Sequence, residues 1–188
     1  MVGSACFALA SIPGAADVST EVVGFVYFIG SIFFTAAAAE QLRTVDRNDR
    51  LDLIASAVQL AGTILFNLDT YNALDDRLSN REFDLMVWVP DALGSICFLI
   101  ASAIAAYAVR HADRHARRIG RLNLVGSVAF GISAIAAVVI PGSGVALNDA
   151  AATSWTLVGA LCFLVAAYLL VPREPKAARN ANRARPSA

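Results

Sequence analysis

Five runs of apolar residues, each long enough to cross a lipid bilayer, restrict what this chain can fold into. Each run contains 18 to 23 residues, and a membrane-spanning helix needs about 20. The whole chain is 57% hydrophobic, above the roughly 45–50% of soluble domains. The sequence therefore predicts an all-α bundle of membrane helices over residues 1–172. The five runs cover residues 20–42, 51–68, 91–109, 119–140 and 154–171.

A sixth apolar run, at residues 2–12, is too short to cross a bilayer. Its 11 residues would make a helix of about 16 Å at 1.5 Å per residue. Either it forms a half-helix or the true start of the protein lies upstream of Met1, and we expect the second. With this run included, the predicted fold is a six-helix transmembrane bundle whose first helix is short or truncated.

The basic residues predict how the bundle is oriented. The chain has 15 Lys and Arg, and 13 of them lie in or beside the connections at 43–50 and 110–121 or in the tail at 173–188. These segments fall on one side of the membrane if each run crosses once. The positive-inside rule places that side in the cytoplasm. We therefore expect a multi-pass plasma-membrane protein with both termini and a basic, disordered tail in the cytoplasm.

A short motif recurs in every predicted helix. It reads GSACF at 3–7, GSIFF at 30–34, GTILF at 62–66, GSICF at 94–98, GSVAF at 126–130 and GALCF at 159–163, with spacings of 27, 32, 32, 32 and 33 residues. A fixed period of this kind indicates repeated copies of one supersecondary unit. The unit is one helix with its connection, or a helical hairpin taken three times.

The motif favours close helix packing. Positions four residues apart lie on one helix face, so the glycine makes a notch beside a phenylalanine. Lipid provides no hydrophobic force between helices, and small residues let their backbones approach. Antiparallel neighbours could place the phenylalanine of one helix over the glycine of the next. An alternative is that the small residues line a conduit. The predicted packing residues are Gly3, Gly30, Gly62, Gly94, Gly126, Gly159, Phe34, Phe66, Phe98, Phe130 and Phe163.

The segments that carry this motif resemble a known group of proteins. GSIFFTAAAAEQL, QLAGTILFN, WVPDALGSICFLIAS, NLVGSVAFGISA and VGALCFLVAAYLL are similar to uncharacterised actinobacterial membrane proteins of the YrhK-like group. The resemblance covers most of residues 20–172. It implies a bacterial integral membrane protein of unknown function, and it supplies no catalytic residues. The short first run departs from the pattern of that group.

The apolar run at residues 51–68 carries an ordered polar face. On a helical wheel, six polar residues from Asp52 to Thr70 fall within an arc of about 80°. An unbonded amide in hydrocarbon is costly, so this face should look inward. It either bonds the helices together or, with two residues of the run at 119–140, lines a polar cavity for a solute or ion. The candidate cavity residues are Gln59, Thr63, Asn67, Thr70, Asn123 and Ser127.

Charged groups near the helix ends have ordinary explanations. Asp91 follows Pro90, where an acidic residue would cap the free amides at the start of a helix. Asp69 lies off the polar arc, near the external end of its helix. No ionisable residue is expected at mid-depth, which argues against proton-coupled transport.

The sequence contains no signature of catalysis or of a bound cofactor. It has no phosphate-binding loop, nucleophile elbow, zinc-protease motif or dinucleotide fingerprint. His111 and His115 have metal-ligand spacing, but the surrounding arginines would repel a cation. We therefore expect no enzyme, metal or cofactor, and no nucleic-acid partner. The expected partner is the lipid bilayer, and a homo-oligomer or a second membrane protein remains open. The predicted role is structural or interactive. The alternative is a small-solute or ion transporter that uses the polar face of the run at 51–68.

Overall fold

The computed structural model describes residues 1–13, 19–139 and 146–171, and within these ranges it is helical with no strand. The predicted all-α, six-helix bundle is confirmed. The basic tail predicted at 173–188 lies outside the described residues. Five of the helices are α1 (Val2–Ala10), α2 (Thr20–Thr44), α3 (Arg50–Asn72), α6 (Arg114–Ala136) and α7 (Asp149–Leu170). Between α3 and α6 lies one long helix. It contains α4 (Asn80–Phe83), a π-helical turn (Asp84–Trp88), α5 (Val89–Ala108) and a 3-10 turn (Val109–His111).

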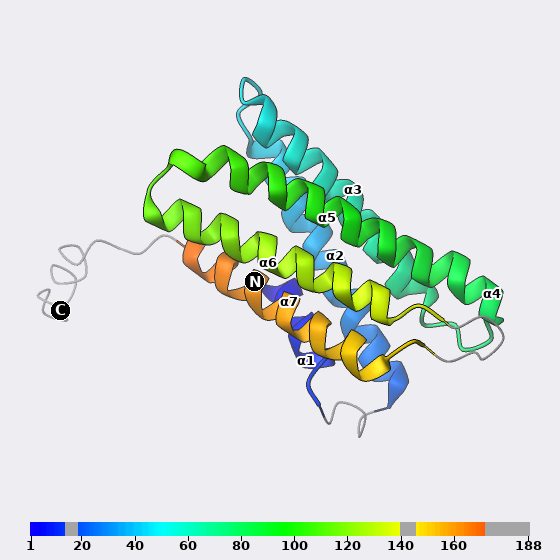
Figure 1. Ribbon diagram of the computed structural model, residues 1–188. Coiled ribbons are helices and arrows are strands. Elements are labelled where there is room, and N and C mark those ends of the chain that lie inside the picture. Colours follow the sequence, from blue (N-terminus) through cyan, green and yellow to red (C-terminus); the bar gives the residue numbers. More distant parts are fainter. Residues whose placement is uncertain (14–18, 140–145, 172–188) are drawn as a thin grey trace, which may run out of the picture.

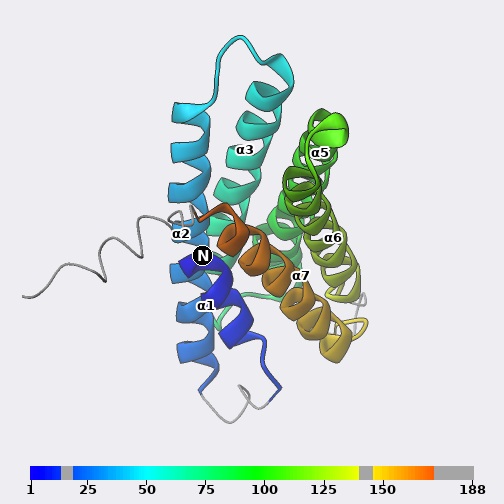
Figure 2. The same cartoon turned by 90° about the vertical axis from the view of Figure 1, so that its left-hand side faces the viewer.

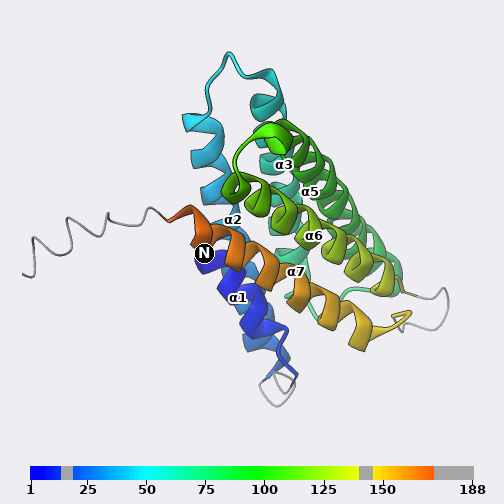
Figure 3. The ribbon, with the colours of Figure 1, turned by 60° about the vertical axis from the view of Figure 1, so that its left-hand side comes forward.

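The helices form a closed ring in chain order (Figure 1). Each helix packs on its neighbours in the sequence, and α1 completes the ring by packing against α7 (Figures 2 and 3). Three helical hairpins make up the ring: hairpin 1 is α1–α2, hairpin 2 is α3–α5, and hairpin 3 is α6–α7. Successive helices run in opposite directions, so the connections alternate between two ends of the bundle.

The two ends of the bundle differ in charge. The end that holds the α2–α3 and α5–α6 connections is called here the arginine end, and the opposite end the acidic end. The short helix α1 lies in the half of the bundle next to the acidic end (Figure 2). The arginine end carries Arg43, Arg47, Arg50, Arg110, Arg114, Arg117 and Arg118, and the acidic end carries Asp75, Asp76, Glu82, Asp84 and Asp149 beside Arg77 and Arg81.

The outer surface of the bundle is apolar. Within the described ranges five helices are long and apolar enough to cross a membrane, counting the long helix Asn80–His111 as one. Many large apolar side chains point outward on every helix of the ring, which a water-soluble monomer rarely tolerates over so large an area. A lipid environment suits this surface. Examples that are 44–51% exposed are Phe25, Ile29, Ile32, Phe33, Ile64, Leu68, Ile96, Ile100 and Val128.

The core of the bundle is a double layer of phenylalanine rings. Each of the six helices contributes the phenylalanine of its repeated motif. Because neighbouring helices are antiparallel, the rings of α1, α3 and α6 lie toward the acidic end, and those of α2, α5 and α7 lie toward the arginine end. In the second layer all three rings are in mutual contact, with centroids 5.7–6.2 Å apart. The first layer is Phe7, Phe66 and Phe130, and the second is Phe34, Phe98 and Phe163.

The long helix begins earlier than the sequence analysis predicted. Ser79 and Glu82 form a reciprocal capping box that starts the helix at Asn80. Pro90, which lacks an amide hydrogen, lies just after the π-helical turn and does not end the helix. The carbonyl of Met86, four residues before Pro90, accepts a hydrogen bond from Asn72 Nδ2 at 2.8 Å. The predicted capping role of Asp91 is therefore wrong, because the helix continues from Asn80 without a free end at this point.

Candidate functional site

The motif glycines meet in pairs within each hairpin. A Cβ atom placed on Gly62 would lie 3.1 Å from the carbonyl oxygen of Gly94, and one on Gly94 would lie 3.2 Å from that of Gly62. Gly126 and Gly159 face each other in the same way in hairpin 3, and in hairpin 1 a Cβ atom on Gly3 would lie 2.7 Å from the carbonyl oxygen of Gly30. The helix backbones touch at these points, and any larger side chain would force them apart.

Each glycine notch is filled by the partner helix. Phe66 of α3 covers Gly94 of α5, with its Cε1 atom 3.1 Å from the Cβ position, and the ring of Phe98 lies 2.9 Å from the equivalent point on Gly62. The other two hairpins repeat this exchange. A cysteine also packs its Cβ atom on one glycine in each hairpin, and these residues are Cys6, Cys97 and Cys162.

The polar face of α3 forms most of its inter-helical hydrogen bonds with α2. Asn67 Nδ2 donates to Thr35 Oγ1 at 2.8 Å. The hydroxyls of Ser31 and Thr70 lie 2.9 Å apart. Nearer the arginine end, Gln41 Nε2 donates to Ser56 Oγ at 3.1 Å. These three bonds follow one another along the α2–α3 interface, where such contacts hold membrane helices together.

The six residues predicted to line a polar cavity have different positions. Thr63 and Ser127 are buried and donate to carbonyls of their own helices, those of Leu60 and Asn123. Gln59 and Asn123 are half-buried. The Oδ1 atom of Asn67 is buried without a hydrogen-bond partner among the described residues. Of the six, Thr70 lines the cavity at the acidic end that is described next.

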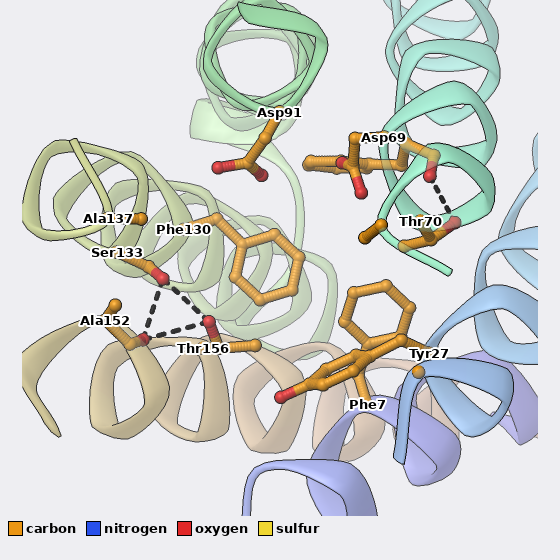
Figure 4. A pocket seen from close by; sticks show the side chains of 13 residues that line it. Phe7, Tyr27, Asp69, Thr70, Asp91, Phe130, Ser133, Ala137, Ala152 and Thr156 are labelled. Carbon is orange, nitrogen blue, oxygen red and sulfur yellow. Dashed lines mark hydrogen bonds between the residues drawn. The ribbon is translucent and has the colours of Figure 1, made fainter. Parts of the chain in front are cut away.

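A cavity of about 220 Å³ lies between the first phenylalanine layer and the acidic end, and it is called here the inner cavity (Figure 4). Three rings of the first layer form its floor, and residues of α1, α2, α3, α5, α6 and α7 line it. The volume corresponds to about seven water molecules at roughly 30 Å³ each, or to one small organic molecule. The lining residues are Phe7, Gly24, Tyr27, Phe66, Asp69, Thr70, Ala73, Asp91, Phe130, Ser133, Ala137, Ala152 and Thr156.

Two carboxylates line the inner cavity. Asp69 of α3 and Asp91 of α5 face it from the side away from Phe7 and Tyr27 (Figure 4). Asp69 is buried at 7% exposure, and Asp91 is half-buried. No described residue donates a hydrogen bond to either carboxylate or forms an ion pair with it. Among the described residues that line the cavity there is no Lys, Arg or His.

The same two carboxylates border a second, outer cavity of about 460 Å³. The outer cavity lies beside the acidic end, between the long helix and the ends of α6 and α7. Asp69 and Asp91 therefore stand where the outer and inner cavities meet. The lining residues of the outer cavity are Asp69, Leu78, Asn80, Phe83, Val87, Trp88, Asp91, Ala137, Val139, Ala146 and Asp149.

The internal repeat relates the carboxylates to a hydroxyl pair in hairpin 3. Asp69 and Ser133 both stand seven residues after the motif glycine of their helices, and Asp91 and Thr156 both stand three residues before it. Ser133 and Thr156 share a hydrogen bond of 2.7 Å. Tyr27 occupies the corresponding position in α2 and bonds Ser11 of α1 at 2.7 Å. In hairpin 2 the equivalent positions hold two acidic groups instead.

Sequence reasoning missed Asp69, Asp91, Tyr27 and Thr156 as members of one site. The sequence did contain a signal for the site. Asp69 lies seven residues after the motif glycine of its helix, and Asp91, Tyr27 and Thr156 each lie three residues before theirs. The wheel of α3 alone placed Asp69 off the polar arc, because that arc faces α2 and the carboxylate faces the bundle axis.

The lining of the inner cavity combines acidic, aromatic and hydroxyl-bearing side chains. Within the described ranges no group of three or more His, Cys, Asp or Glu residues could hold a metal ion. The chain matches no family model, no curated protein and no solved structure.

Proposed function

We propose that the chain is a non-enzymatic, multi-pass plasma-membrane protein that binds a small ligand in the inner cavity. The observation that carries the proposal is a cavity with an aromatic floor, at one end of a membrane bundle, whose two carboxylates are paired with no described residue. A purely structural bundle would be expected to fill this space, since a cavity costs stability. The sequence predicts a structural or interactive role, and the proposal assigns that role to the inner cavity.

The charge of the two ends supports an orientation with the acidic end outside the cell. The arginine end would then face the cytoplasm, together with both termini. In this orientation a ligand reaches the inner cavity from the extracytoplasmic side. We also propose, from the motif segments alone, that the chain is a bacterial membrane protein of the YrhK-like group, which suggests no ligand.

Labelling of single cysteines tests the orientation. In a background without the three native cysteines, Asp75→Cys reports on the acidic end and Ala112→Cys on the arginine end. A membrane-impermeant maleimide added to intact cells should label Asp75→Cys and leave Ala112→Cys unlabelled until the cells are opened. Labelling of Ala112→Cys in intact cells would contradict the orientation.

A cavity-filling substitution tests the binding proposal. Ala152 lines the inner cavity, and the matched control is Ala150, an exposed residue of the same helix. In nanodiscs, single-ring fragments carrying positive, neutral or negative groups are screened by ligand-observed NMR. We expect at least one fragment to bind the natural protein and the Ala150→Leu variant but not the Ala152→Leu variant. A screen in which these two variants never differ would contradict the proposal.

The second candidate function is transport along the polar face of α3. The unpartnered Asn67 Oδ1 favours it, because a buried acceptor without a donor is unusual. The double phenylalanine layer argues against an open conduit. The test is solute or ion flux in proteoliposomes: flux that is lost in a folded Asn67→Leu variant would support transport. Proteoliposomes that leak no faster than empty vesicles would favour the binding proposal.

A further inference from the structure

We propose that the ligand of the inner cavity is a small organic cation. Its positively charged nitrogen is held between Asp69 and Asp91, and its apolar part lies against the aromatic floor and wall. This inference deepens the proposed function and rests on it, because it names the chemical class of the ligand for the same cavity.

The first argument is the unpaired charge. Asp69 is only 7% exposed and therefore 93% buried. Its carboxylate faces the inner cavity beside Asp91 (Figure 4). Burying an isolated carboxylate is costly unless it is paired or hydrogen-bonded. No described residue supplies that partner, and no cationic side chain lines the cavity. A cation that enters the cavity would supply it.

The second argument comes from the internal repeat. Ser133 and Thr156 occupy the equivalent positions of hairpin 3 and satisfy each other through their hydroxyls. A hydroxyl pair is therefore sufficient to pack two helices at this point of the repeat. Two carboxylates at the same point of hairpin 2 repel each other and weaken that packing. Their presence is understandable if the site binds something of opposite charge.

The third argument separates an organic cation from a metal ion. Calcium takes six to eight oxygen ligands, and magnesium requires octahedral geometry. The inner cavity offers two carboxylates on one side and aromatic rings from Phe7, Tyr27 and Phe66 on another. Aromatic faces attract organic ammonium groups and accommodate apolar substituents. The volume of about 220 Å³ suits one ring with a short chain.

The outer cavity provides the way in for such a ligand. Asp69 and Asp91 border both cavities, and Asp149 lines the outer one. Exposed acidic residues, including Asp75 and Asp76, outnumber the exposed Arg77 and Arg81 at the same end. A negative rim concentrates cations near the entrance and excludes anions.

Three probes of similar shape and different charge test the inference. These are 2-phenylethylammonium, neutral 2-phenylethanol and anionic 3-phenylpropanoate, titrated into the full-length protein in nanodiscs by calorimetry. We expect the cation to bind at least about tenfold more tightly than the alcohol, and the anion not to bind. Asp69→Asn and Asp91→Asn keep the side-chain shape, and each should weaken the cation at least about tenfold, as expected when one partner of a desolvated charge pair is lost. The control Asp46→Asn, at an exposed residue of the arginine end, should leave the affinity unchanged.

The outcomes separate this inference from the proposed function. If the alcohol binds as tightly as the cation and the asparagine variants do not matter, the two carboxyls share a proton as a structural pair. In that case the cavity binds a neutral ligand and the inference is overturned. If none of the three probes binds, the inference is also overturned, while the fragment screen with Ala152→Leu still decides whether the cavity binds anything. If an asparagine variant does not fold, Asp69→Glu takes its place, because it keeps the charge. This variant should still bind 2-phenylethylammonium more tightly than 2-phenylethanol.

Discussion

The ring of Phe130 in α6 lies directly on Gly159 of α7. Its Cε1 atom is 2.6 Å from the position that a Cβ atom on Gly159 would occupy, and the carbonyl oxygen of Gly126 is 2.9 Å from the same point. Gly126 in turn lies under the ring of Phe163. This exchange of glycine and phenylalanine between two helices occurs in all three hairpins, and it places the six rings at the bundle axis.

Adding one methyl group at Gly159 should destabilise the protein. In the variant Gly159→Ala the new Cβ atom would overlap with a ring that its neighbours hold in place, and overpacking of this kind costs about 1–3 kcal/mol. The matched control is Gly131→Ala in α6, where nothing lies within 4 Å of the new atom. That change should be neutral or slightly stabilising, because alanine favours a helix over glycine. Thermal unfolding in detergent measures both, and equal midpoints for the two variants would contradict the packing account.

Removing a ring from the second phenylalanine layer should have a larger effect. Phe98 is fully buried at 0% exposure, and its ring contacts those of Phe34, Phe66 and Phe163. The variant Phe98→Ala should lose about 3–5 kcal/mol, which is typical for a truncated buried phenylalanine. Phe33→Ala makes the same chemical change at a residue that is 46% exposed and should cost far less. The result expected from steric trapping or chemical unfolding is a clear gap between the two variants.

The hydrogen bond between Asn67 and Thr35 should contribute little to stability. Such bonds between membrane helices average about 0.6 kcal/mol. A double-mutant cycle with Asn67→Leu and Thr35→Val measures the coupling directly. The control cycle pairs Asn67→Leu with Thr44→Val, whose hydroxyl bonds carbonyls of its own helix at the arginine end. We expect coupling in the first cycle and none in the second. A coupling of several kcal/mol would mean that the polar face of α3 does more than join it to α2.

Acid should weaken the start of α6. The backbone amide of Ala116 donates to Asp113 Oδ1 at 2.9 Å, and this bond, with a smaller contribution from the amide of His115, lowers the pKa of the Asp113 carboxyl below its ordinary value. The unfolded chain therefore binds the proton more readily. The stabilisation is complete above the unfolded pKa of about 4 and is lost as the pH falls through the lower folded value.

The variant Asp113→Asn isolates this effect. Asparagine is also a good N-cap residue but carries no titrating charge. The difference in thermal stability between the natural protein and the variant should therefore shrink as the pH falls from 6 toward 3. A difference that stays constant over this range would show that the carboxylate charge has no role in the cap.

The helices and their shared motif could be predicted from the sequence because both depend on local properties. A run of about 20 apolar residues must form a helix in lipid, since every backbone amide needs a partner within the segment. The six motif glycines could be found by their spacing alone. The predicted start of the long helix at Asp91 is wrong, because the capping box of Ser79 and Glu82 starts the helix at Asn80 and Pro90 does not interrupt it.

The inner cavity is a property of the tertiary structure. Asp69 and Asp91 are 22 positions apart in the chain, and each has an ordinary explanation when its own helix is considered alone. Only the antiparallel packing of α3 on α5, fixed where Gly62 meets Gly94, brings the two carboxylates to one cavity. The sequence by itself determined which segments are helical and which face of each carries the glycine notch, because these follow from periodicity and hydrophobicity. The tertiary structure decided which polar groups bond one another and which remain unpaired, because that depends on distances between helices that no local pattern specifies.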